Sequence, residues 1–307
     1  MRGAYLVALV LIGSASVPAW AQQPQRQRAY PPEMPGAREE VYKRIDGTVL
    51  RLYIYEPKES EPREARLAII FFFGGGWRSG TPAQFYQQCL YLAGRGMVAI
   101  AADYRVESRH QATVAQCVAD AKSAVRWVRA HARQLGIDPD RIVAAGGSAG
   151  GHLAAATALL PGLDEPGEDT SISCRPNALV LFNPAVILAP VEGQTILPAD
   201  RLAALEERFG AAAEQVSPFH NIQRWDRLPP TLILHGRADT TVPYRTVELF
   251  CEAMRKAGAD CELIGYEGQP HGFFNYGRGD NRYYRETLEA VDRFLVRLGY
   301  LTENSNN

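Results

Sequence analysis

The segment Gly146-Gly147-Ser148-Ala149-Gly150 places a serine in the middle of a run of small residues. It follows an apolar run at 141–145 and precedes a helical pattern at 151–160, so the serine lies in a predicted strand-to-helix turn. Such a turn lifts a serine hydroxyl clear of the sheet, and small flanking residues let the two backbones approach closely. The alternative is a glycine-rich turn with an incidental serine, but the flanking strand and helix favour Ser148 as a nucleophile.

A serine hydroxyl becomes nucleophilic when a base accepts its proton and an acid fixes the tautomer of that base. Asp239 follows a predicted strand at 231–234, and His271 follows a predicted strand at 262–266. Both come after Ser148 in the chain, the acid before the histidine, which is the order that accompanies this type of turn. We therefore predict His271 as the base and Asp239 as its orienting acid.

Two other histidines lie near these elements and receive different interpretations. His235 stands at the end of a predicted strand, close to Asp239 in sequence, and is predicted to shape that loop. His152 lies on the helix after the serine, too close in sequence to turn back as its base.

The residues Gly74-Gly75-Gly76 directly follow another predicted strand, at 67–73. Attack on a carbonyl group puts negative charge on its oxygen, which preorganised N–H donors must stabilise. Because a glycine backbone can approach a substrate closely, we predict the N–H groups of Gly75, Gly76 and Ala149 as these donors. The alternative is a flexible turn without this role.

Strand-like and helix-like segments alternate along most of the chain. The predicted strands are 48–55, 67–73, 97–102, 141–145, 179–182, 231–234 and 262–266, and the predicted helices include 114–134, 151–160, 242–256 and 283–298. This alternation predicts an α/β fold with a mostly parallel central sheet and helices on both faces.

The segment from 189 to about 226 breaks this alternation. It contains Pro190, Gly193 and Pro198, then a helical stretch near 199–209, and is too long for a connecting loop. We predict a small cap inserted into a single domain at 46–301. Residues 22–45 are predicted to be a flexible leader and residues 302–307 a disordered tail.

Residues 1–21 have the features of a secretory signal peptide. Arg2 precedes an apolar run at 4–13, and Ala19-Trp20-Ala21 fits the small-x-small cleavage pattern. The run is shorter than the ~20 residues that span a bilayer. We therefore predict cleavage near Ala21 and export to the periplasm or the medium, with an uncleaved anchor as the alternative.

The chain is 46% hydrophobic and 22% charged, and its formal net charge is −1. These values give no case for binding nucleic acid or for stable membrane association. The five cysteines lack the spacing of a metal site. In an exported protein they can form disulfides. A Cys251–Cys261 bridge and free buried thiols are equal alternatives, and a Cys89–Cys117 bridge is a weaker one.

Together these stretches resemble the bacterial esterase and lipase branch of the α/β-hydrolases, which is related to hormone-sensitive lipase and includes secreted carbohydrate-ester hydrolases. The resemblance covers about 48–298. It rests on Phe73-Gly74-Gly75-Gly76-Trp77, Asp103-Tyr104-Arg105, Gly146-Gly147-Ser148-Ala149-Gly150-Gly151-His152, His235-Gly236-Arg237-Ala238-Asp239 and His271-Gly272-Phe273. It implies an eight-stranded sheet, no cofactor, and ester hydrolysis through an acyl-enzyme.

The chain departs from this family in one visible place. The family's glycine motif usually begins with a histidine, which orients the loop by hydrogen bonding, whereas this chain has Phe73. The replacement leaves the predicted N–H donors in place. It leaves open the conformation of the loop and the usual substrate preferences.

The first functional hypothesis is a serine carboxylic-ester hydrolase for short acyl (acetyl-type) or aromatic acyl esters of small molecules or oligosaccharides, including plant carbohydrates. An oligopeptidase-type serine peptidase shares the turn and the triad order, but usually carries a large β-propeller that this chain cannot accommodate. A non-catalytic binding protein on a hydrolase fold typically loses the serine or the histidine, and both are present here. Candidate pocket walls, with the protein core as their alternative location, are Trp77, Phe273, Phe274 and Tyr276.

Overall fold

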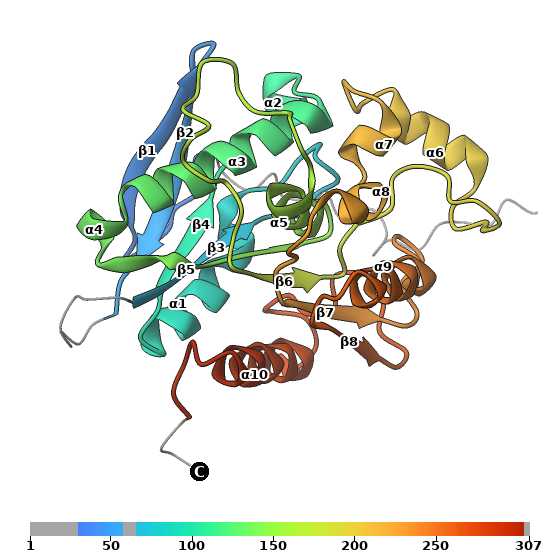
Figure 1. Cartoon of the computed structure of the whole chain (residues 1–307). Helices are drawn as coiled ribbons and strands as arrows, with labels where there is room; N and C mark the ends of the chain where they lie inside the picture. Colours follow the sequence, from blue (N-terminus) through green and yellow to red (C-terminus); the bar gives the residue numbers. More distant parts are fainter. Residues whose placement is uncertain (1–29, 58–65, 304–307) are drawn as a thin grey trace, which may run out of the picture.

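The computed structural model describes residues 30–57 and 66–303. Its centre is an eight-stranded sheet with the order β1-β2-β4-β3-β5-β6-β7-β8 (Figure 1). The strands are β1 (Arg38–Ile45), β2 (Thr48–Tyr55), β3 (Arg66–Phe72), β4 (Val98–Ala102), β5 (Ile137–Gly147), β6 (Ala178–Phe182), β7 (Thr231–Gly236) and β8 (Cys261–Tyr266). β2 is antiparallel to both β1 and β4, and the other neighbouring pairs are parallel. The predicted eight-stranded, mostly parallel sheet is confirmed.

The central strands are continuous apolar runs because both faces of the sheet are covered. In β3 every residue after Arg66 is buried. Ile70 and Phe72 point into the core on one face, whereas Ile69 and Phe71 point into the core on the other. A strand buried on both sides has no solvent face for polar residues, which is why this one is recognisable in the sequence.

Helices cover both faces of the sheet (Figure 1). The helices α3 (Val114–Ala130), α5 (Ala149–Leu159) and α9 (Tyr244–Lys256) contribute buried residues to the core on one face. The helices α1 (Tyr86–Gly94) and α10 (Arg282–Arg297) do so on the other. Two short helices, α2 (Glu107–His110) and α4 (Ala132–Leu135), flank α3. The longest helix on the first face, α3, begins at a capping box in which the Thr113 side chain accepts a hydrogen bond from the Gln116 N–H.

Between β6 and β7 the chain forms the cap segment, residues 189–226. It contains α6 (Ala199–Glu206), α7 (Ala213–Val216), α8 (Pro218–Asn221) and a 3-10 helix (Ile222–Arg224). Figure 1 shows α6 and α7 together on one side of the molecule, above α9 in that view. Phe209 and Val216 join the protein core, but α6 has no buried residue.

The N-terminal prediction needs one correction. The interpretation of 22–45 as a leader is wrong for Arg38–Ile45, which form β1 and pair with β2. Only one residue of β1 is buried, so backbone hydrogen bonds rather than apolar side chains hold it at the sheet edge. The predicted signal peptide at 1–21 and the end of the predicted tail at 304–307 lie outside the described residues. Among the described residues, no helix is long and apolar enough to cross a membrane.

All five cysteines are free and buried in the structure. The Sγ of Cys251 lies 3.4 Å from the carbonyl oxygen of Cys261, to which it donates a hydrogen bond. Of the two equal alternatives for this pair, the structure therefore contains the free thiols. Cys89 and Cys117 belong to the cores on opposite faces of the sheet, so the weaker bridge prediction is wrong.

Candidate active site

Ser148 occupies the turn between β5 and α5 in a conformation rare for a residue with a side chain, with φ 56° and ψ −118°. Its N–H donates to the Phe182 carbonyl at 2.9 Å, and its own carbonyl accepts from the Ala185 N–H at 3.3 Å. A Cβ atom on Gly150 would lie 1.9 Å from the carbonyl oxygen of Phe72. The glycine of the motif is therefore required by the close approach of helix α5 to strand β3.

The structure brings Ser148, His271 and Asp239 together from the ends of β5, β8 and β7. The Nε2 atom of His271 lies 2.9 Å from the Oγ atom of Ser148. Its Nδ1 atom lies 2.6 Å from Oδ2 of Asp239. The His271 side chain is 24% exposed whereas that of Asp239 is fully buried, so the imidazole is open to a substrate while its partner is shielded from water.

The carboxylate of Asp239 is held by four donors. Oδ2 accepts from His271 and lies 3.3 Å from Nε2 of His235, while Oδ1 accepts from the N–H groups of Thr241 and Val242 at 2.8 Å each. Burial alone would raise the pKa of Asp239, but hydrogen bonds from His235, His271 and Val242 hold that pKa well below its usual range. Because this charged carboxylate attracts the Nδ1 proton of the imidazole, the Nε2 lone pair faces the serine hydroxyl.

His235 contributes to this loop, as its position in the sequence suggested. Its Nε2 atom lies 2.9 Å from the carbonyl oxygen of Val242 as well as near Asp239. The Nε2–H group of His235 thus links Asp239 to Val242 within the loop that follows β7.

The glycine loop passes directly beside the serine. Gly75 has φ 126° and Gly76 has φ 62°, values that glycine adopts without strain. A Cβ atom on Gly74 would lie 3.3 Å from Cβ of Ser148. Within residues 30–57 and 66–303, the N–H groups of Gly75, Gly76 and Ala149 donate to no protein acceptor. These N–H groups are available to a developing oxyanion, and their role in stabilising it stays a prediction.

Phe73 orients the glycine loop by packing rather than by hydrogen bonding. Its ring is buried and stacks on the ring of Tyr104 with 4.0 Å between centroids. The hydroxyl of Tyr104 donates to the carbonyl oxygen of Phe73 at 2.8 Å. The Tyr104 side chain therefore fixes both the ring and the backbone where the family usually has a histidine.

Three amides that the sequence did not single out brace the site. Oδ1 of Asn183, directly after β6, accepts from the Gly272 N–H at 2.9 Å. Oε1 of Gln84 accepts from the Gly74 N–H at 2.5 Å, and its Nε2 atom donates to Asn275 at 2.9 Å. Gln84 thereby links the glycine loop to the loop that carries the histidine. Only Asn183 has a sequence signal, which is its position at a strand end.

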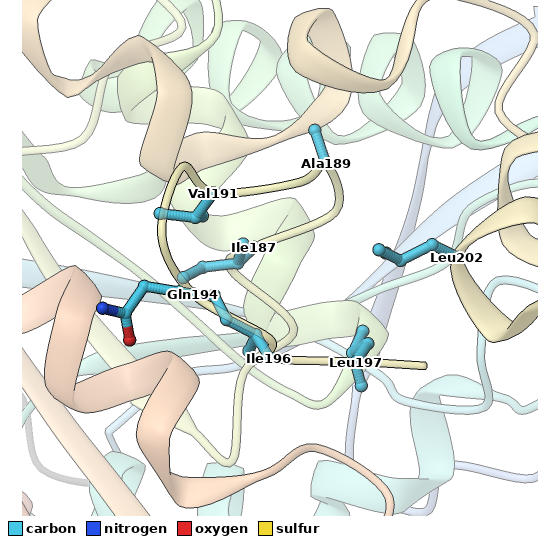
Figure 2. Close-up of a pocket in the computed structure, with 7 residues that line it drawn as sticks. All are labelled: Ile187, Ala189, Val191, Gln194, Ile196, Leu197 and Leu202. Carbon is cyan, nitrogen blue, oxygen red and sulfur yellow. The ribbon is translucent and has the colours of Figure 1, made fainter. Parts of the chain in front are cut away.

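A small apolar pocket of about 30 Å³ lies between the loop after β6 and helix α6 (Figure 2). Its walls are Ile187, Ala189, Val191, Gln194, Ile196, Leu197 and Leu202. The first wall residue, Ile187, lies two positions after Ala185 in the chain, and the Ala185 N–H donates to the Ser148 carbonyl. Helix α6 contacts the other side of the site, because Arg201 donates to the carbonyls of Thr240 and Thr241 beside Asp239.

The aromatic residues that the sequence offered as pocket walls have other locations. Trp77, Phe273 and Phe274 are buried in the core, which was their alternative interpretation, and Tyr276 is 52% exposed. Apart from Gln194, the walls of the pocket are aliphatic, and they come from the loop after β6 and the cap segment.

Comparison with known proteins places this site in a family. The family model BD-FAE matches residues 52–254. The chain belongs to the BD-FAE family. The solved structure of Thermogutta terrifontis esterase 2 with propionate bound is 58% identical, covers 90% of this chain and 100% of that chain, and superposes with a TM-score of 0.84. The same esterase phosphorylated by paraoxon is 56% identical, covers 90% of this chain and 99% of that chain, and has a TM-score of 0.82.

Curated relatives of this BD-FAE member are more distant. The probable isoprenylcysteine alpha-carbonyl methylesterase ICMEL1 of Arabidopsis thaliana is 29% identical over 72% of this chain and 48% of its own length. Esterase LipC of Mycobacterium tuberculosis is 28% identical over 70% of this chain and 55% of its own length. The chain thus spans about half the length of the curated relatives it matches. These relatives are named esterases, which confirms the predicted resemblance to bacterial α/β-hydrolase esterases.

Proposed function

We propose that this BD-FAE member is a serine carboxylic-ester hydrolase that forms an acyl-enzyme on Ser148. The proposal rests on one observation, the continuous contact from Asp239 through His271 to the Ser148 hydroxyl at 2.6 and 2.9 Å. The names of the homologous esterases support the same reaction class.

The geometry supports a two-step reaction. Ser148 Oγ attacks the ester carbonyl while Nε2 of His271 takes its proton, and the N–H groups of Gly75, Gly76 and Ala149 receive the oxyanion. When the tetrahedral intermediate collapses, the Nε2–H protonates the departing alcohol. A water molecule, deprotonated by His271, then attacks the acyl group, and the carboxylic acid leaves as Ser148 regains its proton.

The preferred acyl group is short in this proposal. The pocket between the loop after β6 and helix α6 is mostly apolar and, at about 30 Å³, too small for a long acyl chain. The homologous esterase 2 of Thermogutta terrifontis has been solved with propionate, a three-carbon acid, bound to it. We therefore place acetyl-type and other short acyl esters first, and aromatic acyl esters and carbohydrate esters behind them.

A substrate panel tests this proposal. Acetyl, butyryl and octanoyl nitrophenyl esters are compared with acetylated xylan and a feruloyl ester, beside Ser148→Ala as the matched control. We expect the highest kcat/KM for acetyl or butyryl esters, and loss of turnover in the variant, which removes one hydroxyl and no core volume. No turnover of any ester, together with cleavage of a peptide substrate, would contradict the proposal.

We also propose export. It is supported by the n-region, apolar run and cleavage pattern of residues 1–21. N-terminal sequencing of the protein from the periplasm or medium of an expressing bacterium should begin near Gln22. A cytoplasmic protein that retains Met1 would contradict this proposal.

A further inference from the structure

His152 is a buried side chain on α5 that takes no part in the proton transfers described above. It lies one helical turn after Ser148, whose carbonyl accepts its N–H at 3.0 Å, and it is completely shielded from solvent. Nδ1 of the ring accepts from the indole Nε1–H of Trp77 at 3.1 Å, and Nε2 lies 2.7 Å from the carbonyl oxygen of Val216.

These two contacts fix the tautomer of His152. A carbonyl oxygen can only accept, so Nε2 carries the proton and donates to Val216. The indole N–H can only donate, so Nδ1 is the acceptor. Burial lowers the pKa of His152 to about 4, which keeps the ring neutral and this pattern of donors and acceptors intact at neutral pH.

Trp77, the residue directly after Gly76, has a strained backbone. Its φ of 58° lies in the left-handed region, which bulky residues rarely adopt. Three contacts hold it there: the indole hydrogen bond, edge-to-face packing of the indole on the His152 ring with 5.0 Å between centroids, and donation from the Glu107 N–H to its carbonyl oxygen at 3.0 Å. Such a conformation persists only where the surroundings over-determine it.

The position of Trp77 sets the position of the predicted oxyanion donors. The N–H groups of Gly75 and Gly76 make no hydrogen bond to the described protein, while the Gly75 carbonyl accepts from the N–H groups of Arg78 and Ser79 at 3.1 Å each, directly after Trp77. Two contacts hold the loop after these glycines. Trp77 is hydrogen-bonded to His152, and the Gly76 carbonyl accepts from Arg208 of the cap segment at 2.8 Å. An anchor on α5, the helix that begins at Ser148, sets these donors relative to the nucleophile.

We propose that His152 is a positioning residue that holds the Gly75 and Gly76 N–H groups toward the oxyanion by anchoring Trp77 to the nucleophile helix. This inference rests on the proposed function. The hydrogen bond from His152 to the Val216 carbonyl also connects the cap segment to the His152–Trp77 pair. His152 touches no reacting atom, so its effect is on the stability of the charged transition state and not on proton transfer.

Two substitutions separate the two ring nitrogens. The amide oxygen of His152→Asn occupies the place of Nδ1 and keeps an acceptor for Trp77, but the donor to Val216 is lost. The amide nitrogen of His152→Gln occupies the place of Nε2 and keeps the donor to Val216, but Trp77 loses its acceptor. Both are neutral, and each leaves one buried polar group unpaired, so their effects on stability should be alike.

The measurements are kcat and KM for nitrophenyl acetate, the pH profile, the melting temperature, and the rate of phosphorylation by paraoxon. We expect His152→Gln to lose about tenfold to a hundredfold in kcat with KM and the pH profile unchanged, because a small displacement of catalytic groups has effects of this size. Phosphorylation should slow by a similar factor, since the phosphoryl oxygen uses the same donors. His152→Asn should retain a kcat close to that of the original protein.

Trp77→Phe provides an independent check, because it removes the indole donor from the other side. It should reproduce the kcat of His152→Gln, and the double variant should lose no more than either single one.

The inference is overturned by unchanged kcat in folded His152→Gln, by equal kcat losses in the Gln and Asn variants, or by additive losses in the double variant. Any of these, in a protein that does hydrolyse esters, leaves the proposed function standing. If the unsubstituted protein neither hydrolyses esters nor reacts with paraoxon, the proposed function itself is wrong and the inference is overturned with it.

Discussion

The proposed catalytic residues and the cap segment are held in the fold in different ways. Ser148, Asp239 and His271 follow the ends of β5, β7 and β8, in turns whose backbone is hydrogen-bonded to the sheet. Helix α6 of the cap segment has no buried residue. Its region is held by arginine side chains, Arg201 to the carbonyls beside Asp239 and Arg208 to Gly76 and Glu107.

The difference indicates where substitutions are tolerated. The turn around Ser148 has no room for an additional methyl group, so a change there affects the whole sheet. Helix α6 contributes Leu202 to the pocket wall and has no buried residue, so its residues can change without loss of the fold. In the proposed function, the sheet positions the reacting groups, and we propose that the pocket beside helix α6 selects the ester.

The largest expected effect comes from Asp239→Asn. The amide donates to Nδ1 of His271 and holds the imidazole in the wrong tautomer, so kcat should fall by about 10⁴. Steady-state kinetics at saturating nitrophenyl acetate measure this, with the melting temperature as the control for folding. A loss below about tenfold in a folded variant would exclude Asp239 as the orienting acid.

Gly150→Ala should mainly affect folding. Its Cβ atom would lie 1.9 Å from the Phe72 carbonyl oxygen, and forcing β3 and α5 apart should lower the free energy of unfolding by about 3 kcal/mol. Gly94→Ala at the end of α1 is the matched control, because a Cβ atom there meets nothing within 4 Å. Urea titrations of the two variants measure the difference. Equal stabilities would contradict the close packing of the turn.

Lowering the pH should reduce activity while the Asp239 carboxylate keeps its negative charge. The pKa of Asp239 is held well below its usual range, so this carboxylate stays charged as the pH falls. An imidazolium at His271 cannot accept the proton of Ser148, so kcat/KM should fall as the solution becomes more acidic. A pH–rate profile measures this slope beside melting temperatures at the same pH values. A rate that is flat from acid to neutral pH would count against His271.

The smallest expected effect is in the cap segment. Leu202→Ala enlarges the pocket shown in Figure 2 and should shift the ratio of octanoyl to butyryl kcat/KM upward by about tenfold or less, with stability little changed. Leu205→Ala on the same helix is the matched control, because Leu205 does not line the pocket. An equal shift in both variants would show that the pocket does not select the acyl chain.

The parts of the fold that could be predicted from sequence are those with a local signal. β3 is a continuous apolar run, and the acid and histidine stand at strand ends in the expected order. β1, with the sequence REEVYKRI, has one buried residue and therefore no apolar pattern to recognise. The position of β1 in the sheet depends on its backbone pairing with β2.

The supporting contacts of the site could not be predicted because they join distant parts of the chain. Gln84 meets Asn275 across 191 positions, and Trp77 meets His152 across 75. Tyr104, which was noted only as part of a motif, proves to be the residue that fixes Phe73. Such pairs have no spacing rule, since the order of strands in the sheet decides which loops become neighbours.

The most direct test of the central claim is stoichiometric reaction with paraoxon followed by peptide mapping. We expect one equivalent of nitrophenolate per chain, a diethylphosphoryl group on the peptide that contains Ser148, and no reaction in Ser148→Ala. A phosphoryl group on another residue, or equal reaction of Ser148→Ala, would contradict the assignment of Ser148 as the nucleophile.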